Sequence, residues 1–92
     1  MNWSEVITVR STGINVGPLK SALQELVSGV LRSDVSDSIR IYHREKIDTD
    51  YCIILCHDGE IVLGEGSALG LRLAAALKAV GLVNHSVWVE MK

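Results

Sequence analysis

Residues 51–57 restrict the fold more than any other part of this 92-residue chain. Apolar residues occupy both the odd and the even positions of this run: Tyr51, Cys52, Ile53, Ile54, Leu55 and Cys56. Because successive side chains of a strand point to opposite sides of a sheet, such a run predicts an interior strand that is covered on both faces. Asp58 and Gly59 then form a type I′ hairpin signal. We therefore expect a short extra strand at residues 60–63 that folds back on the interior strand.

Three other segments alternate with the two-residue period of a half-buried strand. Residues 3–11 are rich in β-branched side chains, and residues 84–92 place His85, Val87 and Val89 opposite Ser86, Trp88 and Glu90. Residues 38–44 place Ile39, Ile41 and His43 on one side and Arg40, Tyr42 and Arg44 on the other. These patterns predict three further strands.

Two segments have helical periodicity. The first begins at Pro18, a residue suited to the first helical position, and carries one apolar stripe of Leu19, Leu23, Leu26, Val27, Val30 and Leu31. In the second, we expect Ser67 to be the N-cap and Gly81 to end the helix in a left-handed conformation. Its apolar side is formed by Leu69, Leu73, Leu77 and Val80.

The order of these elements predicts an α+β fold, a ferredoxin-like βαββαβ sandwich in one domain spanning residues 1–92. Two right-handed strand-helix-strand units place both helices on one face of a mainly antiparallel sheet. The other face then has no helix to cover it.

Composition narrows the functional classes. Hydrophobic residues make up 48% of the chain, which is more apolar material than a small monomer easily hides, so we expect a homo-oligomer, a dimer in the simplest case. The net charge of -2 argues against nucleic acid as a partner. The sequence has neither an apolar run long enough to span a membrane nor a signal peptide at its start, so we expect no membrane association and a cytoplasmic location.

The two cysteines do not predict a reactive or metal site. Cys52 and Cys56 share a face of one strand but lie four residues apart, roughly 13 Å, whereas a disulfide needs Cα atoms within about 7 Å. His57 points to the opposite face from Cys56. We interpret both thiols as packing atoms and expect neither a metal nor a cofactor.

The glycine-rich stretch before the second helix resembles part of a dinucleotide-binding motif, but its spacing is wrong, because the third glycine position falls on Leu69. A small anion held by backbone N–H groups at the start of the helix is the remaining hypothesis, with Gly66, Ser67 and Ala68 as its residues.

A ligand or partner face is predicted on the uncovered side of the sheet, formed by Arg40, Tyr42, Arg44 and Trp88. Trp88 has polar neighbours on its own parity, Ser86 and Glu90, so we expect it to face away from the helices. Burial of an exposed aromatic ring is favourable, so we expect either a second subunit or a small-molecule ligand to pack against it.

The stretch of residues 39–56, IRIYHREKIDTDYCIILC, resembles the central hairpin of small dimeric α+β-barrel proteins that include the antibiotic-biosynthesis-monooxygenase group. There a strand bearing Tyr or Arg turns back into an apolar strand, as Tyr42 and Arg44 precede Ile53, Ile54 and Leu55 here. The resemblance implies a homodimer paired sheet to sheet, and some members of the group oxidise aromatic polyketide-type substrates without a cofactor. The aromatic-rich second strand and the helix histidine often seen in the group are lacking, so no catalytic residue is carried over.

We therefore expect a small homo-oligomeric binding module that uses the uncovered sheet face for self-association or a ligand. One alternative is a cofactor-independent, monooxygenase-like enzyme with a pocket between sheet and helices near Tyr42, His43 and Trp88. Such an enzyme needs converging titratable groups, so this alternative fails if Tyr42, His43 and His57 point into different spaces. A single-stranded RNA platform is a further alternative, although the RNA-stacking signature of such sheets is missing.

Overall fold

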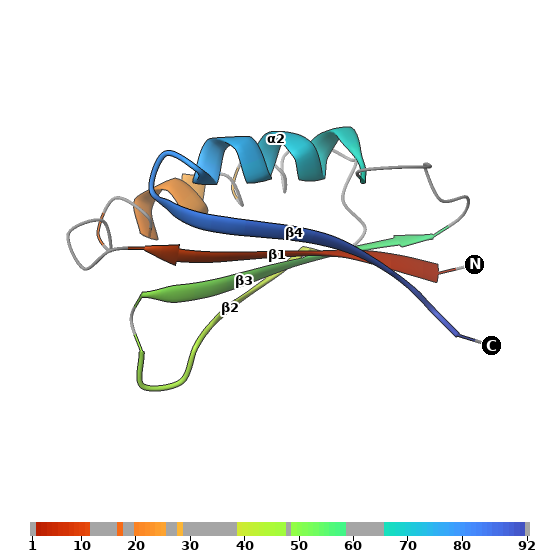
Figure 1. The fold of residues 1–92 in the computed structure, drawn as a ribbon, viewed down its shortest axis with the longest axis horizontal. Helices are drawn as coiled ribbons and strands as arrows, with labels where there is room; N and C mark the ends of the chain where they lie inside the picture. Colours follow the sequence, from red (N-terminus) through yellow and green to blue (C-terminus); the bar gives the residue numbers. More distant parts are fainter. Residues whose placement is uncertain are drawn as a thin grey trace.

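The computed structural model describes residues 2–11, 17, 20–25, 28, 39–47, 49–58 and 66–91. Its strands are β1 (Asn2–Ser11), β2 (Ile39–His43), β3 (Asp50–Asp58) and β4 (Gly81–Val89), and its helix α2 spans Ala68–Leu77. The strand order in the sheet is β2-β3-β1-β4, and every neighbouring pair is antiparallel. Residues 20–25 are also helical and lie on the same side of the sheet as α2 (Figure 1). The predicted α+β, ferredoxin-like arrangement is confirmed.

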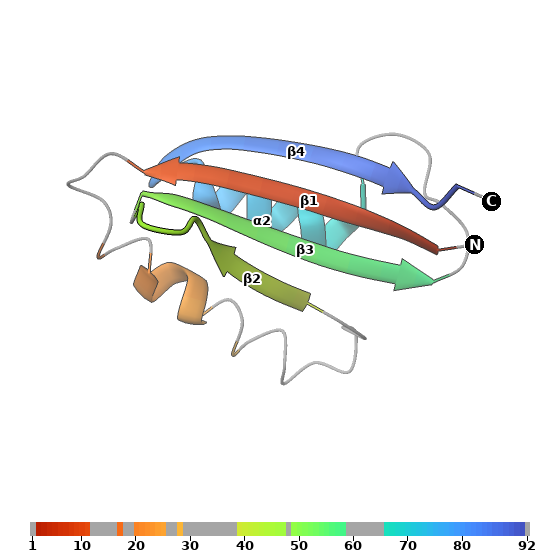
Figure 2. The same ribbon diagram turned by 90° about the horizontal axis from the view of Figure 1, so that it is seen from below.

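The core lies between the sheet and α2. Ile7 and Val9 of β1 and Ile53 and Leu55 of β3 point from the sheet toward the helices, where Leu23, Leu73 and Leu77 meet them. Each such side chain contributes about 1.5–3 kcal/mol when it is fully buried. Seen from the opposite side, the sheet is open along its described strands (Figure 2). We call the two sides the helix face and the outer face.

The extended conformation of residues 51–57 is confirmed, because all of them belong to β3. Both cysteines are free and half-buried on the outer face. The expected two-sided cover of this strand is wrong for the described part of the chain. Its side chains alternate between buried on the helix face and half-buried on the outer face, since α2 packs on one side only. The predicted short strand at residues 60–63 lies outside the described residues.

The end of the second helix also differs from the prediction. The N-cap is Ser67, as expected, but α2 ends at Leu77, and its C-cap Lys78 is right-handed. Gly81 is the first residue of β4 and is not among the residues with positive φ. A Cβ at Gly81 would lie 2.4 Å from the carbonyl oxygen of Arg10. Glycine is needed there because β1 and β4 approach closely, not because the helix requires a left-handed cap.

No helix among the described residues is long and apolar enough to cross a membrane.

Candidate functional site

Glu5 is a carboxylate in the middle of the apolar helix face. It belongs to β1, lies between Trp3 and Ile7 on the same face, and is 0% exposed. An ionised carboxylate in such surroundings is costly unless hydrogen bonds replace its lost hydration. The partners of Glu5 therefore decide whether it is charged.

Three residues from distant parts of the chain bind the two carboxylate oxygens of Glu5. Ser67 donates twice, from its backbone N–H to Oε1 at 2.8 Å and from its hydroxyl to Oε2 at 2.5 Å. The Nε2 atom of His57 on β3 lies 2.6 Å from Oε2. The Nε2 atom of His85 on β4 lies 2.9 Å from Oε1. We call Glu5, His57, Ser67 and His85 the Glu5 cluster.

These contacts fix the charge state of the carboxylate. Burial by itself raises the pKa of Glu5, but the hydrogen bonds from Ser67, His57 and His85 together outweigh it, and the pKa lies below its ordinary value. The group is thus ionised at neutral pH. Since an ionised carboxylate only accepts hydrogen bonds, each imidazole donates from Nε2. In a neutral ring this leaves Nδ1 with a lone pair, able to accept a proton.

The glycines near the start of α2 make room for Glu5. A Cβ at Gly66 would lie 2.2 Å from Oε1 of Glu5, and one at Gly70 would lie 2.1 Å from the same atom. Gly66 also has a φ of 112°, which an L side chain rarely adopts. The glycine-rich stretch therefore serves a close approach of α2 to β1.

The position predicted for an anion at Gly66, Ser67 and Ala68 is partly occupied by a carboxylate of the protein itself. The N–H of Ser67, one of the donors that such an anion requires, binds the Glu5 carboxylate. An internal anion thus already lies at the helix N-terminus, where the helix dipole favours negative charge. Binding of an external anion there stays a prediction.

The two imidazoles differ in their surroundings. His57 stacks on Trp3 with ring centroids 4.2 Å apart, and its side chain is 24% exposed. His85 is 12% exposed and lines a groove of about 450 Å³ between α2 and β4. The groove is otherwise lined by one basic and four apolar residues, Lys78, Leu71, Ala74, Ala75 and Val83. His85 thus connects the buried carboxylate with a space that a small molecule can enter.

The residues predicted from sequence lie elsewhere. The register pairs Arg40 with Ile54 and Tyr42 with Cys52, which places both on the outer face, and Trp88 pairs with Ser4 on that face. Tyr42 and Trp88 are exposed, and the indole N–H of Trp88 donates to Ser86 Oγ at 2.8 Å. Arg44 lies beyond β2 and binds Asp50. The placement of Tyr42 and Trp88 on one uncovered face agrees with the sequence pattern.

The pocket expected near Tyr42, His43 and Trp88 does not form from these residues. Tyr42 and Trp88 lie on the outer face, whereas His43 is exposed and its Nδ1 lies 3.2 Å from the Arg44 carbonyl oxygen. His57 instead turns to the helix face and binds Glu5. By the criterion of converging groups, an enzyme built on Tyr42, His43 and His57 is excluded. The groups that do converge are those of the Glu5 cluster.

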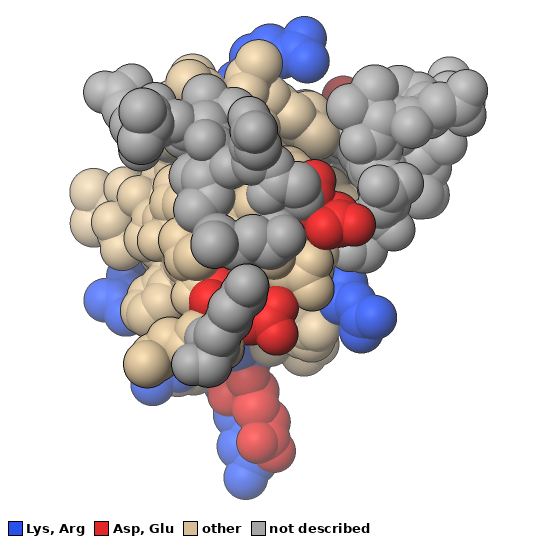
Figure 3. Space-filling view, turned by 90° about the vertical axis from the view of Figure 1, so that its right-hand side faces the viewer, with Lys and Arg blue, Asp and Glu red and all other residues tan. Residues whose placement is uncertain are grey.

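The charges on the surface are mixed. In the view onto the end of the molecule that carries both termini, acidic side chains lie near the centre and at the lower edge, and basic side chains lie at the top, the sides and the lower edge (Figure 3). Among the described residues, no group of three or more His, Cys, Asp or Glu side chains is arranged to hold a metal ion.

Sequence comparison assigns no relatives, since no protein-family model and no curated protein matches the chain. Solved structures do share its fold. Rv0793 from Mycobacterium tuberculosis has a TM-score of 0.73 at 14% identity, covering 100% of this chain and 97% of that one. SnoaB from Streptomyces nogalater, a cofactor-independent oxygenase, has a TM-score of 0.67 at 13% identity, covering 99% and 94%. A further structure, an antibiotic biosynthesis monooxygenase, has a TM-score of 0.69 at 9% identity, covering 98% and 99%. The predicted resemblance to this fold group is confirmed.

Proposed function

We propose that the chain is a small-molecule enzyme of the cofactor-independent, monooxygenase-like type, in which His85 acts as a general base. The observation that carries the proposal is the buried Glu5 carboxylate that binds the Nε2 atoms of both His57 and His85. The fold shared with a cofactor-independent oxygenase gives additional support.

The cluster suits the removal of a proton. A positioned imidazole with a free Nδ1 accepts a proton from an acidic O–H or C–H group of the ligand, and the nearby Glu5 carboxylate stabilises the imidazolium that forms. The ligand becomes an anion, and the ammonium group of Lys78, a residue that lines the same groove, balances that charge in this proposal. An electron-rich anion of this kind is what an oxidation by O2, the co-substrate, requires when no cofactor supplies the electrons.

The groove fits the size and polarity of such a ligand. Its volume is about 450 Å³, within the range of small-molecule sites. Leu71 and Val83 supply apolar contacts, while His85 and Lys78 are the polar groups. A small apolar molecule with one ionisable group is therefore the substrate class that we propose.

The proposal is tested by oxygen uptake with an anthrone as substrate. We expect uptake above the rate without protein, and a fall of about 10²-fold or more in His85→Gln, since general-base catalysis contributes about 10²–10⁴-fold. Glu5→Gln keeps the shape but removes the charge and is expected to lower the rate as well. His43→Gln, an exposed histidine outside the Glu5 cluster, is the matched control and should leave the rate unchanged. Equal rates in H85Q and wild type would show that His85 is not the base.

A second candidate is the homo-oligomeric binding module expected from composition, with Arg40, Tyr42, Arg44 and Trp88 on its partner face. The specific observation in its favour is aromatic exposure on the outer face, where Trp88 is 62% and Tyr42 48% exposed. Burial of such rings in a dimer removes about 150–250 Å² of surface each from water. Sedimentation should show a dimer whose dissociation constant rises at least about tenfold in Trp88→Ser. A monomer at high protein concentration would contradict this candidate.

A further inference from the structure

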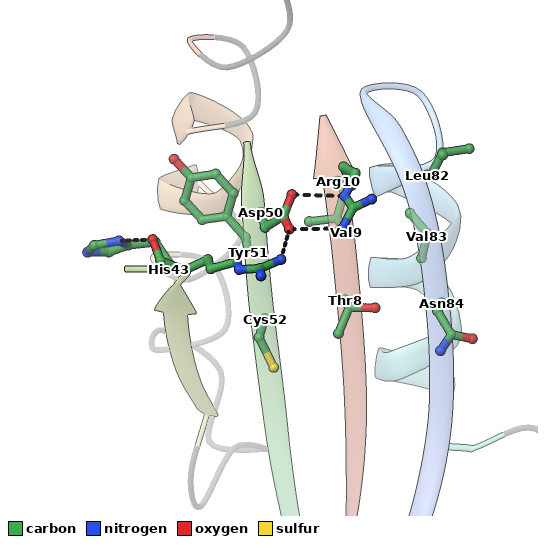
Figure 4. Close-up of a pocket in the computed structure, with 11 residues that line it drawn as sticks. Thr8, Val9, Arg10, His43, Asp50, Tyr51, Cys52, Leu82, Val83 and Asn84 are labelled. Atoms are coloured by element: carbon green, nitrogen blue, oxygen red, sulfur yellow. Dashed lines mark hydrogen bonds and ion pairs between the residues drawn. The ribbon is translucent and has the colours of Figure 1, made fainter. Parts of the chain in front are cut away.

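The outer face carries a concave site near the start of β4, at the end of this strand that lies away from Trp88. Its floor consists of two cross-strand rows, each with one residue from β3, β1 and β4: Asp50, Arg10 and Leu82 in one row, and Cys52, Thr8 and Asn84 in the other. Arg44, which follows β2, also lines the site. Figure 4 shows Arg10 on β1 and Asp50 on β3 pointing toward each other. The cavity measures about 530 Å³. We call it the arginine cavity.

Two guanidinium groups meet at one carboxylate in the arginine cavity. Arg10 binds Asp50 with Nε and Nη2, at 3.1 and 3.3 Å, and Arg44 binds it with Nη1 at 3.3 Å. Thr49 Oγ1 donates to the same carboxylate at 3.0 Å. The hydrogen bond from Arg10, followed by those from Thr49 and Arg44, outweighs burial and lowers the pKa of Asp50, so the carboxylate is ionised at neutral pH. The two guanidiniums are thereby held close together in a defined orientation.

Both arginines keep donors for another partner. A guanidinium has five N–H groups in a planar fork. The bonds to Asp50 leave Nη1 of Arg10, and Nε and Nη2 of Arg44, without a hydrogen-bond partner among the described residues. The side chains of Arg10 and Arg44 are 65% and 58% exposed, so these donors are within reach of solvent. With one negative and two positive charges, the group has a net charge of +1.

The remainder of the cavity is mostly apolar. Leu82 and Cys52 line it on the outer face, and Leu82 is exposed to 79%. We propose that the arginine cavity binds a small organic carboxylate, with the carboxylate on Arg10 and Arg44 and the apolar body against Leu82 and Cys52. The single net positive charge matches a monoanion, and the planar forks match the geometry of a carboxylate.

This inference does not depend on the proposed oxidation. The floor of the arginine cavity is formed by outer-face residues, whereas the Glu5 cluster lies on the helix face. The partner face of the second candidate includes Arg44 but not Arg10, and the arginine cavity does not include Trp88. Arg10→Gln therefore tests the cavity, and Trp88→Ser tests the partner face.

The test is a titration of the full chain with benzoate at low ionic strength, followed by amide chemical shifts in NMR. We expect shifts at Thr8, Arg10 and Leu82 that saturate. Benzamide, the neutral analogue of similar shape, should cause much smaller shifts. The dissociation constant for benzoate should rise at least tenfold in Arg10→Gln and in Arg44→Gln. Arg72→Gln, an exposed arginine of α2 that does not line the cavity, is the matched control and should bind benzoate as the wild type does.

Arg10→Lys separates the role of the fork from that of the charge. It keeps the positive charge and the fold but loses bidentate geometry, so its affinity should lie between those of wild type and R10Q. Unchanged benzoate binding in R10Q and R44Q would overturn the proposal, as would equal responses to benzamide and benzoate. Equally tight binding of inorganic phosphate would show a general anion site and refute the assignment to an organic carboxylate.

Discussion

Replacement of Gly70 by alanine tests whether the Glu5 cluster controls the packing of α2. In an ordinary helix this change stabilises, by up to about 1 kcal/mol, because alanine has the higher helix propensity. Here the added Cβ would lie 2.1 Å from Oε1 of Glu5 and 2.7 Å from its Cδ. Either the helix or the carboxylate must move.

The cost of that movement exceeds the gain in propensity. Overpacking a core costs about 1–3 kcal/mol. Loss of one hydrogen bond to the buried charged group costs about 1.5–3 kcal/mol more. After subtraction of about 1 kcal/mol for propensity, we expect Gly70→Ala to destabilise the fold by about 1.5–5 kcal/mol. For a domain of this size, each kcal/mol lowers Tm by roughly 4–8 °C.

The assay is urea unfolding of four proteins that form a double-mutant cycle: wild type, G70A, Glu5→Ala and the double variant. The three nearest atoms to a Cβ at Gly70 all belong to Glu5. The effect of G70A should therefore vanish or change sign in the E5A background. Gly17→Ala is the control, since Gly17 is also helical and a Cβ there would meet nothing within 4 Å. If G70A stabilised the protein as G17A is expected to do, the reasoning about Glu5 would be refuted.

Three further predictions follow from the same structure. The pKa of Glu5 is lower in the folded state than its ordinary value of 4.5, so the contribution of Glu5 to stability is fully present above that value and is lost as pH falls through the folded pKa. The stability difference between wild type and Glu5→Gln, measured by urea unfolding, should therefore shrink only in acid. A stability difference that does not depend on pH would contradict the lowered pKa. Gly81→Ala should lower stability by about 1–3 kcal/mol in thermal unfolding, since its Cβ would lie 2.4 Å from the Arg10 carbonyl oxygen; an unchanged Tm would refute the close approach of β1 and β4. After mild oxidation, non-reducing mass spectrometry should show both cysteines still free. Cys52 should react slowly with a thiol reagent, because burial raises the pKa of its thiol. An intramolecular disulfide would exclude the extended conformation of β3.

Periodicity was sufficient to predict the layers of the fold. The alternation around Trp88 and Tyr42 identified the outer face, and the apolar run at residues 51–57 identified an interior strand. Both patterns reflect which side of an element is buried, and this is a local property of the chain. Gly81 was misinterpreted because glycine after a helix usually serves as a left-handed cap, whereas here it permits two strands to approach.

The candidate site was missed because it depends on contacts between distant residues. Glu5 shares its parity with Trp3 and Ile7, so a carboxylate on the buried face of β1 was visible in the sequence. No ligand spacing in the sequence connects His57 with His85. Only the register, which pairs Trp3 with His57 and Ile7 with His85, places them on either side of Glu5. A charged residue at a core position is the signal that could have indicated a buried polar cluster.

The Glu5 cluster has a consequence for the order in which the chain acquires its stability. Glu5 lies in the first strand, whereas His57, Ser67 and His85 all come from later parts of the sequence. Burial before β4 has emerged would leave Oε1 with the Ser67 N–H but without the Nε2 donor of His85, and the buried charge would be less well compensated. We therefore expect the helix layer to close over β1 only after β4 has been synthesised.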